Sequence, residues 1–218
     1  MSNPPRREAT YQDLLQVPDH LVAQIVDGVL YVSPRPALGH SGVEGDLFAE
    51  LAGPFQRGRG GPGGWWLAVE AEVHLGASVL VPDLAGWRRE RLPDWPKAPY
   101  LTLAPDWVCE ILSPSTARFD RGRKFDRYAR EGVGHAWLID PLDCTLEAYA
   151  LEQGRWVRLG LWRMGETVRV PPFDAVPLEL AEIFRNPPEP ERVAEVDPDF
   201  AWPTRQPGEF PQVEAPVP

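Results

Sequence analysis

Lysine and cysteine are scarce in this sequence, and it has no long apolar run. The chain of 218 residues holds only 2 lysines against 20 arginines, and only 2 cysteines. So few cysteines exclude a disulfide framework, and Cys109 and Cys144 in their strand-like stretches are expected to be reduced, buried thiols. No apolar run reaches the roughly 18–20 residues that cross a bilayer, and the first residues lack the apolar core of a signal peptide. We therefore expect a cytoplasmic protein without a membrane segment.

An excess of positive charge is also missing. The formal net charge is −10, which argues against indiscriminate binding to polyanions, because such proteins carry a basic footprint. Half of the net negative charge lies in residues 187–218, which also hold 9 prolines. This composition is typical of an extended, poorly ordered arm. Residues 118–130 reverse the trend with five arginines and one lysine, a local basic face that is usually a solvated helix side.

The rest of the chain has the pattern of one mixed α/β (α+β) domain. Strand patterns surround Asp27-Gly28, a dipeptide that favours a tight hairpin turn, and helical spacing covers residues 38–57. Further strand patterns are a predicted hairpin over residues 65–87, a strand at "WVCEIL" and another at "HAWLID", with helix-start residues before 117–131. We predict a mixed central sheet flanked by helices over residues 8–185, followed by a proline-rich acidic tail over 186–218.

Two acids interrupt apolar strand patterns. Asp83 lies in "VPDLAGW" and Glu110 lies in "WVCEIL", and a carboxylate in such a strand is costly unless a cation meets it. If the two strands are neighbours, both carboxylates can project toward one point, where they repel each other unless a cation or a shared proton lies between them. Ligands that offer only oxygen suit Mg²⁺ or Mn²⁺.

Two further groups could complete such a site. Glu72 could add a third oxygen ligand or orient a water, although Glu70 has the same face parity and alternation cannot separate the two. Lys124 shares a helix face with Asp120 and Tyr128 through its i, i+4 and i+8 spacing. In a chain where arginine is the default cation, a lysine here indicates a need for a compact ammonium beside a water or a phosphate oxygen.

These motifs resemble those of the Uma-two family, which has the PD-(D/E)xK restriction-endonuclease-like fold. The resemblance rests on "VDGVLYVSPRPALGH", "VPDLAGW" and "APDWVCEILSPSTARFDRGRKFDRYAREGVGHAWLIDP" in this order, and it covers about residues 8–185. It implies that Pro82-Asp83 supplies the first acid and Glu110 the second. The usual lysine, two residues after the second acid, is replaced by Leu112, and the resemblance implies that Lys124 stands in for it.

The resemblance implies metal-assisted hydrolysis of phosphodiester bonds. Asp83 and Glu110 would hold one or two divalent ions, Mg²⁺ or Mn²⁺, while Lys124 would position a water or neutralise charge in the transition state. The partner that such an activity requires is nucleic acid, with DNA favoured over RNA although the resemblance does not settle the substrate, and many nucleases of this fold pair two sites in a homodimer. Members are named endonucleases largely from their fold. A nuclease-fold protein that binds nucleic acid or a partner chain without cutting is the alternative, favoured by the acidic net charge and by Leu112.

Three more residues are candidate substrate contacts. Arg121 and Arg127, on either side of Lys124, could hold neighbouring phosphates. His40, at a predicted helix start, could also touch a phosphate, or it could cap or pack beneath that helix. His40 and Glu44 lie four residues apart, but a pair without a third ligand is a poor zinc signal.

Overall fold

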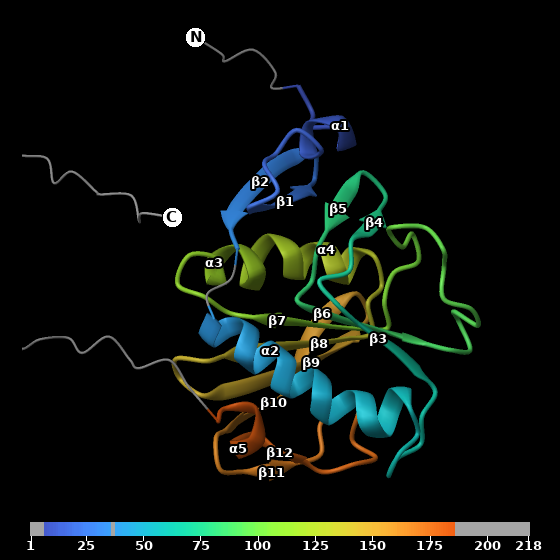
Figure 1. The fold of residues 1–218 in the computed structure, drawn as a ribbon, viewed down its shortest axis with the longest axis vertical. Helices are drawn as coiled ribbons and strands as arrows, with labels where there is room; N and C mark the ends of the chain where they lie inside the picture. Colours follow the sequence, from blue (N-terminus) through green and yellow to red (C-terminus); the bar gives the residue numbers. More distant parts are fainter. Residues whose placement is uncertain (1–6, 36–37, 186–218) are drawn as a thin grey trace, which may run out of the picture.

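A six-stranded mixed sheet forms the centre of the protein (Figure 1). The structure, a computed structural model, describes residues 7–35 and 38–185, and the predicted tail lies outside the described residues. The strand order is β10-β9-β8-β7-β6-β3, in which β7 and β8 are parallel and the other neighbours are antiparallel. The strands are β3 (Trp65–Val69), β6 (Leu84–Arg88), β7 (Trp107–Ile111), β8 (His135–Asp140), β9 (Thr145–Glu152) and β10 (Arg155–Arg163). The predicted mixed sheet is confirmed.

A second, four-stranded antiparallel sheet lies beside the large one, at the top of Figure 1. Its order is β2-β1-β5-β4, and it begins with the predicted hairpin, whose turn is Asp27-Gly28 with positive φ at both residues. Its strands are β1 (Leu21–Val26), β2 (Val29–Pro34), β4 (Val73–Leu75) and β5 (Ser78–Leu80). A short pair of strands, β11 (Thr167–Val168) and β12 (Leu178–Glu179), completes the strand inventory of the described residues.

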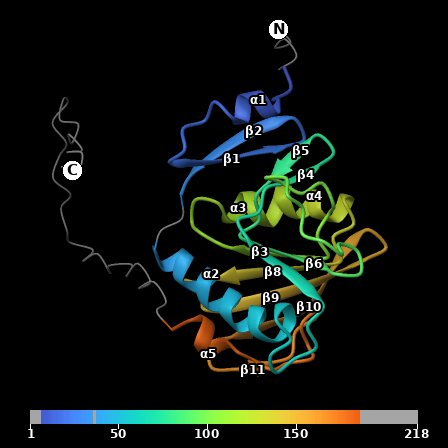
Figure 2. The same cartoon turned by 45° about the vertical axis from the view of Figure 1, so that its right-hand side comes forward.

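Helices cover both faces of the large sheet, as the turned view in Figure 2 also shows. Helix α2 (Leu38–Leu51) continues into a π-helical turn (Ala52–Gln56) on one face. On the other face α3 (Ala117–Phe119), a π-helical turn (Asp120–Lys124) and α4 (Phe125–Arg130) follow one another without a break. The two short helices are α1 (Tyr11–Leu14), which Thr10 and Asp13 close with a capping box, and α5 (Leu180–Ile183). No helix of the described residues is long and apolar enough to cross a membrane.

Successive residues of β7 face opposite layers, because side chains alternate along a strand. Trp107, Cys109 and Ile111 belong to the core beneath α2, and Val108 belongs to the core beneath α4. By the same alternation Glu110 points toward α4, where the hydroxyl of buried Tyr128 donates to it. The position of Glu110 in the alternation of β7 therefore decides which helix contacts this acid.

The predicted hairpin over residues 65–87 is divided between the two sheets. Its outer parts pair as β3 and β6 in the large sheet, and its inner parts pair as β4 and β5 in the small one. The chain changes sheets at residues 70–72 and again at 81–83. Glu70 takes a left-handed backbone conformation there, with φ of 45°, and Pro82 has no N–H for a sheet ladder. This junction brings acids from the hairpin to the boundary between the sheets.

Candidate active site

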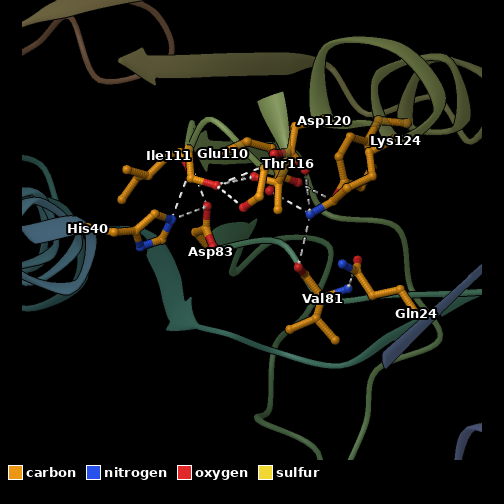
Figure 3. A network of polar contacts seen from close by, with 12 residues as sticks. Gln24, His40, Val81, Asp83, Glu110, Ile111, Thr116, Asp120 and Lys124 are labelled. Atoms are coloured by element: carbon orange, nitrogen blue, oxygen red, sulfur yellow. Dashed lines mark hydrogen bonds and ion pairs between the residues drawn. The ribbon is translucent and has the colours of Figure 1, made fainter. Parts of the chain in front are cut away.

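A cavity of about 280 Å³ lies at this boundary, next to the end of β7. Four carboxylates line it, from Glu70, Asp83, Glu110 and Asp120, and so do three residues with a basic side chain, Arg35, His40 and Lys124. Figure 3 shows His40 approaching from α2, Lys124 from the opposite helix, and the two predicted acids between them. The structure therefore brings together four of the residues that the sequence singled out: His40, Asp83, Glu110 and Lys124.

Lys124 is the cation that meets Glu110. Its Nζ lies 2.6 Å from Glu110 Oε2, and the two side chains are 3% and 1% exposed. The ammonium also donates to the Val81 carbonyl at 3.1 Å and lies 3.5 Å from Asp120 Oδ1. The other oxygen of Glu110, Oε1, accepts a hydrogen bond of 2.6 Å from the Tyr128 hydroxyl. Both oxygens of this buried carboxylate therefore have a donor, which is what a buried acid needs.

Burial and charge act against each other in this pair. Burial alone would lower the pKa of Lys124, but the charges of Glu110, Asp120 and Asp83 outweigh it and raise the pKa above its ordinary value. Burial raises the pKa of Glu110 to about 8, although Lys124 opposes this rise, and Asp83 and Asp120 add to it. Lys124 therefore stays protonated, and the surplus of carboxylates over cations keeps the site short of positive charge.

Asp83 closes the cavity on the α2 side. Its Oδ2 accepts a hydrogen bond of 2.6 Å from the Ile111 N–H and lies 3.4 Å from His40 Nε2. The same imidazole nitrogen is 2.8 Å from the Ile111 carbonyl oxygen. When Nε2 carries a proton, it donates a hydrogen bond to that oxygen and so links the start of α2 to the end of β7. Burial lowers the pKa of His40, but Asp83 and Glu44 outweigh it and the net shift is upward.

Glu44 is an acid whose place beside the cavity sequence reasoning did not foresee. It lies one helical turn after His40 and is buried, and its Oε1 is among the buried polar atoms without a hydrogen-bond partner in the described part of the chain. Burial, followed by the charges of Asp83 and Glu70, raises its pKa to about 7. The i, i+4 spacing of His40 and Glu44 is the sequence feature that predicts both side chains on one face of α2.

The structure separates the two glutamates that alternation could not. Glu70 lines the cavity, whereas Glu72 does not. The Glu72 carboxylate accepts from the Tyr11 hydroxyl at 2.8 Å and pairs with His74 Nε2 at 2.6 Å. Glu72 therefore connects α1 to β4, and Glu70 is the one of the two that lines this cavity with Asp83 and Glu110.

The two predicted arginines also lie outside this cavity. Arg121 pairs with Glu147 of β9 at 2.7 Å. Arg127 pairs with Asp27 at 3.2 Å and with Glu131 at 2.5 Å. Acids of neighbouring elements thus neutralise much of the basic face that the sequence shows. Of the two cysteines, Cys109 is buried, Cys144 is half-buried, and both are free.

The donor set of the cavity suits a hard divalent cation. Among residues 7–35 and 38–185, no group of three or more His, Cys, Asp or Glu side chains is already arranged to hold a metal ion. The side chains present are nevertheless carboxylates, the ligands that Mg²⁺ and Mn²⁺ prefer. The unpartnered Oε1 of Glu44, close enough to Asp83 and Glu70 for their charges to raise its pKa, marks a place where positive charge is lacking.

The fold described above is a mixed sheet with helices on both faces and a cavity lined by acids. A solved structure with this fold is titled "putative nuclease belonging to DUF820" and comes from Anabaena variabilis ATCC 29413. It matches with a TM-score of 0.66 and 22% identity, over 81% of this chain and 98% of that chain. This likeness shows the fold.

The family follows from a match to the sequence. The family model described as "Uma2: Putative restriction endonuclease" matches residues 9–181. The chain therefore belongs to the Uma2 family, and the resemblance seen in its motifs is confirmed. No curated protein matches the chain.

Proposed function

We propose that this protein is a metal-dependent endonuclease that hydrolyses phosphodiester bonds of nucleic acid. The observation that carries the proposal is the buried Lys124–Glu110 pair in the wall of a cavity that Asp83 also lines. A fully buried lysine and acid are costly to maintain for stability alone, and such groups in a cleft are candidates for a functional site. Membership of a family described as restriction endonucleases supports the same activity.

Asp83 and Glu110 would hold the Mg²⁺ or Mn²⁺ ion. Glu70 would take the role of third oxygen ligand that the sequence assigned to Glu72, because Glu70 lines the cavity and Glu72 does not. A divalent ion bound there would stabilise negative charge on the phosphate and lower the pKa of a bound water. The strained backbone of Glu70 agrees with this role, since such conformations cluster at functional sites.

Lys124 would supply fixed positive charge to the reacting phosphate. The Val81 carbonyl and Asp120 hold its ammonium independently of Glu110, so the ammonium keeps its place when Glu110 engages a cation. A preorganised donor of this kind stabilises charge that develops in the transition state. Arg121 and Arg127 stay candidate phosphate contacts, but each would have to open an ion pair first.

Cleavage assays with Mn²⁺ on single-stranded and duplex DNA and RNA test the proposal. Lys124→Met should slow cleavage on the order of a hundredfold or more, because it removes an electrostatic contact made in the transition state. Lys97→Met is the matched control, since Lys97 is the chain's other lysine and is exposed, outside the cavity. Equal rates for wild type and Lys124→Met would remove the lysine from the mechanism.

A second variant guards against loss of the fold. Lys124→Met leaves Glu110 buried without its ion-pair partner, and breaking a buried pair can cost about 3–5 kcal/mol of stability. Asp83→Asn is milder, because an amide oxygen can still accept the Ile111 N–H. In EDTA the melting temperatures of wild type and Asp83→Asn should be similar. With Mn²⁺ only the wild type should rise, because a ligand of the native state stabilises that state.

Two other results would contradict the proposed metal site or the proposed catalysis. An equal Mn²⁺ shift in Asp83→Asn would place the ion away from this residue. Wild type that binds nucleic acid but cuts nothing with Mg²⁺ or Mn²⁺ would establish the non-catalytic alternative.

A further inference from the structure

A second cavity adjoins the one just described. Its volume is about 410 Å³, and it shares the lining residues Val22, Arg35, Glu70 and Val81 with the first cavity. Its remaining wall comes from the end of α1, the loop that follows it, β1, and Glu72. The two hollows therefore meet at Arg35 and Glu70, and a chain that lies in one can continue into the other.

Arg35 is the arginine among the described residues that line these two cavities. Its Nε and Nη2 donate to the Asp19 carbonyl at 3.1 and 2.8 Å. These bonds hold the planar guanidinium in one orientation, but a backbone carbonyl does not cancel its charge. Glu70, Asp83 and Glu110 repel a polyanion, so a fixed arginine beside them marks the position that a phosphate group can occupy.

Part of the wall of the second cavity is aliphatic, while Asp19, Glu70 and Glu72 also line it. The aliphatic part is formed by Leu14, Leu15, Val17, Pro18, Leu21 and Val22. None of the α1 residues is buried, and Leu15 is 53% exposed, so this apolar surface faces the cavity rather than a core. A nucleotide has parts that match this division, because its phosphate is anionic while its base has apolar faces.

We propose that the second cavity is a subsite for the nucleotide next to the scissile phosphate of a single strand, with Arg35 holding that nucleotide's phosphate. The inference rests on the proposed nuclease function and adds the strand state of its substrate. The cavity has the size of a small-ligand pocket, and a base inside a duplex cannot enter such a pocket unless it leaves the stack. Duplex regions would therefore bind less tightly than unpaired ones.

Binding of labelled oligonucleotides in EDTA tests the subsite without any cleavage. Three variants each make the net charge more negative by one unit: Arg35→Gln, Leu15→Glu in the apolar wall, and Arg155→Gln as the control. Arg155 is exposed on β10, away from both cavities. Fluorescence anisotropy over a range of salt concentrations gives the affinity and its salt dependence for single-stranded and duplex DNA and RNA.

We expect Arg35→Gln to weaken single-strand binding on the order of tenfold and to reduce the slope of log K against log salt by about 0.7. Leu15→Glu should weaken single-strand binding with an unchanged slope, because it removes no phosphate contact. Arg155→Gln should behave as wild type. Single strands should bind more tightly than duplex.

Two results would overturn the inference, and only one of them would also overturn the nuclease proposal. If wild type cuts nucleic acid while Arg35→Gln and Leu15→Glu bind as Arg155→Gln does, the subsite is wrong and the nuclease proposal stands. If wild type neither binds nor cuts any of the four nucleic acids, the nuclease proposal fails and the subsite with it.

Discussion

At the residue scale, the site is a set of acids that share too few cations. Glu110 has two donors, Lys124 and Tyr128, and Asp83 accepts from the Ile111 N–H. Glu44 has an unpartnered oxygen in the described part of the chain. Burial first, and then the charges of Asp83 and Glu70, raise the pKa of this carboxyl to about 7.

Glu44 should make the folded protein less stable as the pH rises toward neutrality. Its pKa is about 7 in the folded protein, against an ordinary value of 4.5. A carboxyl whose pKa is raised by folding binds its proton more tightly in the native state, so the free energy of unfolding falls between these two pH values and levels off above them. The fall is at most about 3 kcal/mol from a shift of this size.

Glu44→Gln should remove this fall, because glutamine does not titrate. Urea unfolding of wild type and Glu44→Gln in EDTA at several pH values gives the difference directly. In an Asp83→Asn background the pH-dependent part should shrink, because the Asp83 charge contributes to the raised pKa. A difference between wild type and Glu44→Gln that is constant with pH would contradict the prediction.

At the scale of the elements, the site depends on close packing around the strand that follows Asp83. Gly86 lies in β6 between β3 and β7. A Cβ at this position would lie 3.0 Å from a Leu67 methyl, 3.2 Å from the Trp107 ring and 3.3 Å from the Trp65 ring. These side chains are buried, so they have little room to move away.

Gly86→Ala should therefore destabilise the protein by about 1–3 kcal/mol, the usual cost of an overpacked core. Gly45→Ala is the matched control. Gly45 lies in α2, where an added Cβ would have no atom of another element within 4 Å, and alanine there should stabilise the helix by up to about 1 kcal/mol. Chemical denaturation measures both. Equal effects of the two substitutions would show that crowding at Gly86 does not limit stability.

At the scale of the whole molecule, two hydrophobic cores account for the fold. One lies between the large sheet and α2 with α5, and the other lies between that sheet, α4 and the small sheet. Their fully buried members run from Val26 to Phe184. The cavity lies where the small sheet meets the large one, so its shape depends on how both cores are packed.

A chain that ends at Arg185 should fold and melt like the full-length protein, because it keeps every member of the two cores described above, from Val26 to Phe184. Calorimetry compares the melting temperatures, and light scattering of both forms tests the homodimer that the resemblance to nucleases of this fold implies. A monomeric mass for both forms would contradict that expectation. A dimer seen only for the full chain would place its interface in residues 186–218.

Local sequence patterns predict much of the secondary structure of this fold. The hairpin at Asp27-Gly28, the helix over 38–57 and the strand around Glu110 follow from turn chemistry and from periodicities of 3.6 and 2, which act over a few residues. The structure has these elements within a residue or two of their predicted bounds. The family motifs added the order of the elements and the expectation of a central mixed sheet.

Periodicity along the chain is sufficient to place two acids in apolar strands and a rare lysine on the helix that follows. Which of these residues meet depends on how the elements pack in three dimensions. The division of the hairpin between two sheets places Glu70 at the cavity and turns Glu72 toward Tyr11 and His74. Glu147 of β9 pairs with Arg121, and Asp27 of the turn between β1 and β2 pairs with Arg127. The physical reason is that spacing along a chain sets the face of an element, whereas the packing of elements against one another sets what that face contacts.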